Sequence, residues 1–247
     1  MSVFNYFIKD SNWKKKLAIG TGLDFILMIN CLIIFTVIQN EALIIQPIYR
    51  NISVLAILMV LITFIFYLGY ISINTNLRIS KPEYVLANFE NPKHMLTIGL
   101  KSFIVIFIMP SVYGLLLFPF CCIALYIQKI LQVSYISTII SIFSLFLIIT
   151  FGFIVIYSSF ISFYYDLRIR SAFNLKRIKK IITNGTPNVL SAIIRNIFIF
   201  TCLGIILLLS GAWVKNIYII PCLTFLCFLI TSKINARCLR RTLLEEK

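Results

Sequence analysis

The chain has 247 residues, of which 60% are hydrophobic, and a mean hydropathy of +0.99. An ordinary soluble domain is less apolar, so this composition excludes that class. The formal net charge is +15, but Lys and Arg flank long apolar runs. We therefore expect no nucleic-acid partner. The expected partner is the lipid bilayer, whose anionic headgroups attract each basic residue by about 1 kcal/mol.

Six apolar runs follow one another along the chain. Each has at least the roughly 17 residues that a helix needs to cross a bilayer, and a backbone in lipid must satisfy its own hydrogen bonds. The runs are Leu17–Ile38, Ile52–Ile73, Leu96–Ile127, Val133–Tyr165, Leu190–Ser210 and Tyr218–Ile234. The predicted fold class is all-α: a polytopic membrane helix bundle of six spans, with residues 1–247 as one transmembrane domain.

Positive charge falls on every second gap between these runs. Twenty of the 23 Lys and Arg lie in residues 1–16, 74–101, 166–195 and 233–247. Basic residues mark the cytoplasmic side of a membrane protein. The pattern predicts a multi-pass protein of the cytoplasmic (inner) membrane with both termini in the cytoplasm.

A threefold internal repeat is predicted from the starts and ends of the runs. Asn12–Gly20 is similar to Asn91–Gly99 and, more loosely, to the segment from Asn184. The three span ends read Asn76-Leu77-Arg78, Asp166-Leu167-Arg168 and Asn235-Ala236-Arg237. The units would be residues 1–78, 79–170 and 171–240, each a helical hairpin. Convergence is the alternative, because Asn-Pro or Thr-Pro helix starts and C-terminal Arg suit any such hairpin.

Basic and apolar residues alternate with helical spacing in residues 173–182, between the fourth and fifth runs. Such a stretch is typical of an amphipathic helix in the plane of the membrane interface. The apolar face is Leu175, Ile178, Ile181 and Ile182, and the basic face is Lys176, Arg177, Lys179 and Lys180. Weaker stripes occur in residues 3–8 and 84–89. At the span ends, Arg78, Arg168, Arg170 and Arg237 are expected to reach lipid headgroups.

Prolines and glycines inside the runs suggest further features. Pro110 and Pro119 in the third run predict a kinked or partly re-entrant helix, or a kink that serves packing alone. Small residues permit close helix contact. The glycines expected to do so are Gly20, Gly22, Gly69, Gly114 and Gly204.

Asp24 is the one carboxylate well inside a run, about 10 Å beyond Leu17 at 1.5 Å per residue. A charge there usually faces the interior of a bundle. Lys101 and Arg195 begin the third and fifth runs at matching depth. We expect an intramembrane ion pair that fixes helix register. The alternatives are a polar path for a solute or proton, and a position in the headgroup zone without a special role.

The sequence offers little for catalysis. His94 is the only histidine and is interpreted as a surface residue. No metal-ligand spacing, nucleophile elbow or phosphate-binding glycine loop is found. We therefore assign no catalytic, cofactor-binding or metal-ligating residue and predict that the protein is not an enzyme.

Tyr164–Arg170, followed by Phe173-Asn174-Leu175, resembles a span-end motif of prokaryotic six-helix integral membrane proteins of unknown function. That group includes the membrane domain found with some glycerophosphoryl diester phosphodiesterases. Gly69-Tyr70 through Arg78, with Leu96–Gly99, resembles a second such family. Ser171-Ala172 departs from the usual Lys/Arg-Glu. The resemblance implies six spans but no phosphodiesterase activity, because no soluble phosphodiesterase domain is recognised.

These observations favour a non-enzymatic integral membrane protein that acts through contacts with lipid or with a partner protein. The partner would be another membrane protein or a second copy of the chain. The alternatives are a small-solute transporter or channel, whose path would pass Asp24, and a membrane-embedded enzyme that acts on lipid.

Overall fold

The computed structural model describes residues 12–40, 46–80, 87, 89, 91–130, 135–209 and 219–243. These residues form α-helices and no strand. The helices are α2 (Trp13–Gln39), α4 (Pro47–Ser80), α5 (Pro92–Ile130), α6 (Tyr135–Asp166), α7 (Ile169–Ala172), α8 (Leu175–Leu209) and α9 (Ile219–Leu243). Six of them are long and apolar enough to cross a membrane. The predicted class, an all-α polytopic helix bundle, is confirmed. The stripes predicted in residues 3–8 and 84–89 lie outside the described residues, apart from Ala87 and Phe89.

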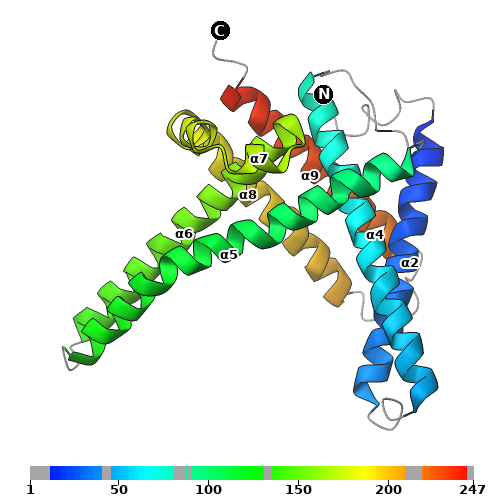
Figure 1. Ribbon diagram of the computed structural model, residues 1–247, viewed down its shortest axis with the longest axis horizontal. Helices are drawn as coiled ribbons and strands as arrows, with labels where there is room; N and C mark the ends of the chain where they lie inside the picture. The colour runs from blue at the N-terminus through cyan, green and yellow to red at the C-terminus, as the bar shows by residue number, and fades with distance from the viewer. Residues whose placement is uncertain are drawn as a thin grey trace.

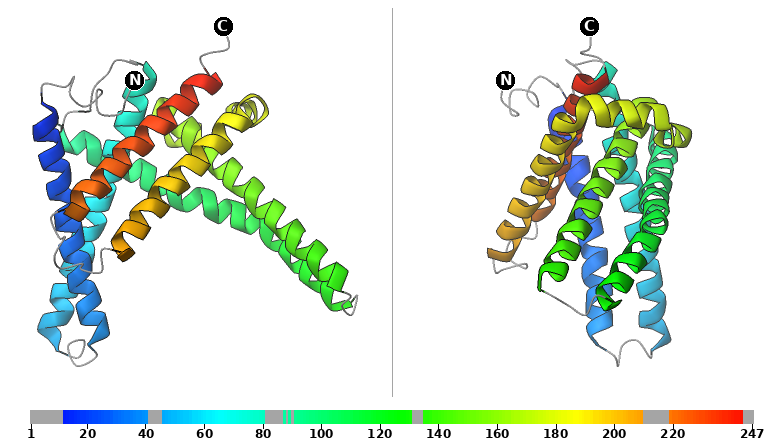
Figure 2. Two further views of the ribbon diagram at one scale, coloured as in Figure 1. Left: turned by 180° about the vertical axis from the view of Figure 1, so that it is seen from behind. Right: turned by 90° about the vertical axis from the view of Figure 1, so that its left-hand side faces the viewer.

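The helices form two arms that meet at one end of the molecule. Figure 1 shows α2 and α4 side by side in one arm and α5 with α6 in the other, diverging toward their far ends. Seen from behind in Figure 2, α9 and α8 lie across the region where the arms meet. The start of α2 and the end of α9 lie at this same end. The splayed arrangement confines the contacts among all six spans to one half of the bundle.

Several helices continue past the apolar runs at the basic end. Helix α4 ends at Ser80 although its apolar run stops at Ile73, and α9 reaches Leu243 although its run stops at Ile234. The predicted boundaries were too short because the polar side chains at these ends find partners inside the protein, as described below.

Helix α8 corrects the prediction of a separate interfacial helix. It is one helix that contains Pro187, so Thr186-Pro187 is not the helix start that the sequence suggested. Figure 2 shows its first part lying across the end of the bundle and its second part running along the other spans. Pro187 has no N–H for the Thr183 carbonyl, which favours a bend there. The Thr186 hydroxyl donates to the Ile182 carbonyl in the same turn.

Helix α5 begins where the sequence predicts and then runs without a break. Its first residue is Pro92, and the Asn91 side chain accepts a hydrogen bond from the His94 N–H at 3.0 Å. Pro110 and Pro119 both lie inside this helix. A continuous helix excludes the re-entrant alternative.

Three apolar clusters join helices that are far apart in the sequence. The first joins α4 and α9, with Tyr70 and Phe225 at its centre. The second joins α6, α8 and α9 around Ile161, Ile181 and Leu239. The third joins α5, α6 and α7 and consists of Val105, Met109, Phe163 and Ala172.

Two glycines allow the backbones of α4 and α5 to touch. A Cβ atom on Gly69 would overlap the Met95 carbonyl oxygen, and one on Gly99 would overlap the Ile65 carbonyl oxygen. Gly20 likewise faces the ring of Phe225. The predicted close contacts are therefore present at Gly20 and Gly69. At the other three expected positions, Gly22, Gly114 and Gly204, a Cβ would meet no described atom within 4 Å.

Gly69→Ala and Gly99→Ala should each lower the free energy of unfolding by about 1–3 kcal/mol, because a methyl group forces the two backbones apart. The matched control is Gly22→Ala, which adds a methyl group to open space and should be neutral or slightly stabilising. Denaturant unfolding in detergent micelles measures the three variants. Equal stability of Gly69→Ala and Gly22→Ala would contradict the close crossing.

Candidate functional site

Polar side chains on the last turns of α4 are buried and reach three different elements. The Ser72 and Ser102 hydroxyls are 2.6 Å apart, which ties α4 to α5. The Thr75 and Ser232 hydroxyls are 3.0 Å apart, which ties α4 to α9. The Asn74 side chain accepts a hydrogen bond from the Ala87 N–H at 2.8 Å. Residues from 74 onward were expected in a cytoplasmic gap. They lie in the core because these bonds satisfy their polar atoms there.

The predicted position of Arg78, near the end of α4, is also wrong. It was expected to extend toward lipid headgroups, but only 6% of its surface is exposed. Its Nη1 donates to the Leu229 carbonyl in α9 at 3.3 Å. The reason is that α4 continues as a helix inside the bundle, which places Arg78 against α9.

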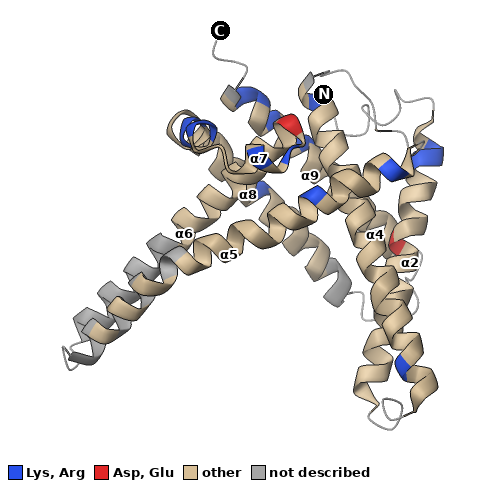
Figure 3. Cartoon of the chain, in the orientation of Figure 1, with Lys and Arg blue, Asp and Glu red and all other residues tan. Residues whose placement is uncertain are grey.

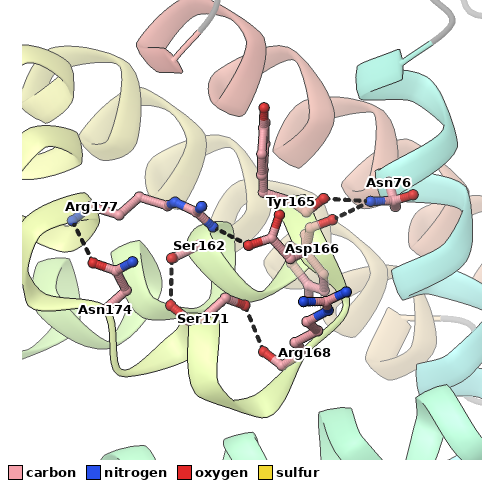
Figure 4. A network of polar contacts seen from close by, with 9 residues as sticks. Asn76, Ser162, Tyr165, Asp166, Arg168, Ser171, Asn174 and Arg177 are labelled. Atoms are coloured by element: carbon pink, nitrogen blue, oxygen red, sulfur yellow. Dashed lines mark hydrogen bonds and ion pairs between the residues drawn. The ribbon is translucent and has the colours of Figure 1, made fainter.

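Figure 4 shows a polar corner where α6, α7 and α8 meet. The Asn76 amide donates to the Tyr164 and Tyr165 carbonyls at 2.9 and 2.7 Å. The last carbonyls of a helix lack partners within it, so Asn76 caps α6 from outside. Leu167, which follows α6, has a φ of 53°. A left-handed leucine costs about 1–2 kcal/mol and ends the helix sharply.

The same corner contains an ion pair between Asp166 and Arg177, with an N–O distance of 2.6 Å and side-chain exposures of 32% and 24%. The Arg177 guanidinium also lies 4.9 Å from the centre of the Tyr165 ring. Exposed pairs of this kind contribute at most about 1 kcal/mol. Arg177 therefore belongs to this corner as well as to the predicted basic face.

The corner contains the motif on which the family resemblance rests. Ser162 donates to the Ser171 carbonyl at 2.6 Å, and Ala172 is completely buried. The Asn174 side chain accepts from the Arg177 N–H at 3.1 Å and caps α8. In this chain the motif builds a turn between helices. Ser171-Ala172 suits that turn because its space is too small for a longer side chain.

Of the predicted basic face of α8, Lys176, Lys179 and Lys180 are exposed and Arg177 is half-buried. Its predicted position in the membrane interface stays a prediction. The apolar face behaves differently from the prediction. Ile178 and Ile181 are buried, and Ile181 packs in the cluster with α6 and α9, whereas Leu175 is 78% exposed. Much of this apolar face therefore packs against other helices of the protein. Arg168 and Arg170 in the neighbouring α7 region are exposed, and their predicted contact with headgroups stays a prediction.

Asp24 is buried, with 4% of its surface exposed, and has a partner that the sequence did not suggest. Its Oδ2 accepts a hydrogen bond from the Tyr67 hydroxyl of α4 at 3.0 Å. Within the described residues it forms no ion pair with Lys101 or Arg195. Lys101 is half-buried on α5, and Arg195 is exposed on α8, so the structure does not bring the three residues together.

Arg195 instead lines a groove of about 170 Å³ between α8 and α9. Four cationic side chains line the α8–α9 groove together with polar and apolar residues. From α8 these are Asn188, Ser191, Ala192 and Arg195, and from α9 they are Ile230, Lys233, Ile234, Arg237, Cys238 and Arg241. The spacing of four between Lys233, Arg237 and Arg241 puts them on one face of α9.

The α8–α9 groove is strongly positive. Among the described residues that line it there is no carboxylate, and neither α8 nor α9 contains Asp or Glu. The described residues include two carboxylates, Asp24 and Asp166, and both are engaged elsewhere. Arg237 follows Lys233 by one turn of α9, so the two like charges repel each other. Glu245 and Glu246 lie outside the described residues. Such an array of guanidinium and ammonium groups binds anions, above all phosphate, which Arg can hold with two parallel hydrogen bonds.

Sequence reasoning named Arg195 and Arg237 but did not place them together, and it missed Lys233 and Arg241 as site residues. The spacing of four between Lys233, Arg237 and Arg241 indicates one cationic helix face. The predicted apolar run ends at Ile234, so the later residues lay outside any predicted helix and this face was not recognised.

The fold and the groove define an all-α, multi-pass membrane protein with a cationic site at one end. No family model, curated protein or solved structure matches the chain. The resemblance to prokaryotic six-helix membrane proteins, including the phosphodiesterase-associated domain, therefore stays a prediction. Among the described residues no three His, Cys, Asp or Glu side chains are grouped so that they could hold a metal ion.

Tyr67→Phe should lower the free energy of unfolding by about 1–3 kcal/mol, because it removes the hydrogen-bond donor to the buried Asp24 carboxylate. Tyr126→Phe, which alters an exposed tyrosine, is the control and should be neutral. Combining Tyr67→Phe with Asp24→Asn should cost less than the sum of the two single changes, as measured by unfolding in micelles. The hydrogen bond would be contradicted if the two single changes added up in the double variant, or if Asp24→Asn were instead energetically coupled to a change of Arg195.

Ala172→Glu introduces the acidic residue of the motif that this segment resembles and should destabilise the corner by about 3 kcal/mol, because it buries an unpaired carboxylate. Leu175→Glu, at an exposed position three residues later, is the control and should have little effect. Thermal unfolding of detergent-solubilised protein compares them. Unchanged stability of Ala172→Glu would show that the α7 turn has room for a long side chain.

Proposed function

We propose that the chain is a non-enzymatic protein of the cytoplasmic membrane that works through contacts with anionic lipid headgroups on the cytoplasmic leaflet. The observation that supports this is the distribution of charge. Figure 3 shows Lys and Arg gathered around the end where the two arms meet. Arg50 belongs to the first turn of α4, near the far end of its arm.

The cations at this end come from several elements and are accessible. Exposed members include Lys93 at the start of α5, Arg170 in α7, Lys179 in α8 and Arg237 in α9. Basic groups at an anionic surface contribute about 1 kcal/mol each, screened by salt. A broad set of cations on one face therefore gives an attraction that depends on the charge density of the leaflet.

The spans supply the second kind of contact. Leu115, Phe118 and Phe198 are 75%, 67% and 67% exposed. Exposed apolar side chains on membrane-length helices match acyl chains, another membrane protein or a second copy of this chain. A protein partner would bind along these surfaces.

Two cysteine variants test the orientation in a cysteine-free background. Arg50→Cys should react with a membrane-impermeant maleimide from outside intact spheroplasts, whereas Lys179→Cys should react only after permeabilisation. The reason is that the basic end faces the cytoplasm. Labelling of both positions from the same side would contradict the proposal.

The lipid contact is tested in phosphatidylcholine nanodiscs with and without phosphatidylglycerol. The anionic lipid should raise thermal stability at low salt, and high salt should weaken the effect. Replacing Lys176, Lys179 and Lys180 together by Gln should reduce the gain by up to about 1 kcal/mol per lysine. Equal stability in neutral and anionic discs would refute the proposed function.

A further inference from the structure

We propose that the α8–α9 groove is a specific binding site for a phospholipid whose phosphate headgroup carries at least two negative charges. This inference rests on the proposed function, because it requires the basic end to face a leaflet that contains such lipids. It goes further in assigning a defined site and a ligand class.

The charge of the groove sets the charge of its ligand. Arg195, Lys233, Arg237 and Arg241 share about 170 Å³, and none of the lining residues that the structure describes is acidic. Lys233, Arg237 and Arg241 follow one another at intervals of four residues on α9, and like charges at this spacing repel one another. A phosphodiester neutralises one charge. A phosphomonoester or a second phosphate offsets more of the repulsion and offers more oxygens to the guanidinium groups.

Two helices present these groups from opposite walls. One wall is formed by Lys233, Arg237 and Arg241 on α9. The other wall is formed by α8, where Arg195, Ser191 and Asn188 lie on the same face. Arg195, Arg237 and Arg241 are exposed, so their guanidinium groups are accessible to a headgroup. The hydroxyl and amide add hydrogen-bonding groups for phosphate oxygens or for a glycerol hydroxyl.

The depth of the groove favours a lipid over a soluble phosphate. Arg195 and Lys233 each lie about 21 Å from the far end of their helix at 1.5 Å per residue, and both belong to stretches long and apolar enough to cross a membrane. Ile230 forms the deeper end of the groove. Ile197 and Phe198, just past Arg195 on α8, are 59% and 67% exposed. Acyl chains attached to a phosphate in the groove would continue along this apolar surface.

Native mass spectrometry of the full chain in detergent tests the assignment, with phosphatidic acid as the phosphomonoester probe and phosphatidylglycerol as the phosphodiester. Phosphatidic acid should bind at least about fivefold more tightly, which corresponds to one further cation engaged. The double variant Arg195→Gln/Arg237→Gln should abolish this preference. The control Lys15→Gln/Arg50→Gln removes the same charge from exposed positions outside the groove and should keep it.

The outcomes separate the inference from the proposed function. A preference that survives in the double variant, or disappears equally in the control, overturns the groove as the site. Displacement of phosphatidic acid by inorganic phosphate makes a soluble anion the ligand and overturns the lipid assignment. If wild type binds neither anionic lipid, the proposed function fails as well. Should the double variant not fold, Arg241→Gln alone should weaken phosphatidic acid binding by about fivefold, and unchanged binding overturns the proposal.

Discussion

The buried polar turns at the end of α4 hold the bundle together. A helix that leaves an apolar layer normally meets water, but here Ser72, Asn74 and Thr75 each find a partner on another element. Buried polar groups without partners cost about 1–3 kcal/mol each, so these bonds fix the register of α4 against α5 and α9. The Gly69–Gly99 crossing lies next to them and brings the α4 and α5 backbones into contact.

This constraint also explains why the cations of α8 and α9 are found together. Hydrogen bonds from Arg78 and Thr75 of α4 fix the position of α9. The apolar cluster around Ile181 and Leu239 packs α8 against α9. This packing places Arg195 opposite the three cationic residues of α9 that line the groove. The apolar cluster and the hydrogen bonds of α4 therefore hold the two walls of the groove, and the exposed guanidinium groups of Arg195, Arg237 and Arg241 are accessible to a ligand.

The sequence predicts the spans well and the contacts poorly, for a physical reason. Hydrophobic runs report where a chain is in lipid, so all six helices were found. The hydropathy pattern also predicted that the apolar spans end near Ile73 and Ile234, which is short of the true ends of α4 and α9. Polar residues lower the hydropathy even when they are buried against partners on another helix. The pairing of Asp24 with Tyr67 was missed for the same reason, since a tyrosine among apolar residues gives no sign of where its hydroxyl points. Arg195 and Arg237 were named individually, but their meeting depends on the bend of α8 at Pro187 and on the extension of α9.

The splayed arms have a consequence for how the protein sits among lipids. Where α2 with α4 and α5 with α6 diverge, each pair of helices lacks the support of the rest of the bundle (Figure 1). In a membrane, lipid would border the diverging parts of both arms, whereas the end where the arms meet is held by the α4 hydrogen bonds. A detergent that supports the arms poorly would therefore first loosen their far parts, while the end held by these bonds keeps its structure.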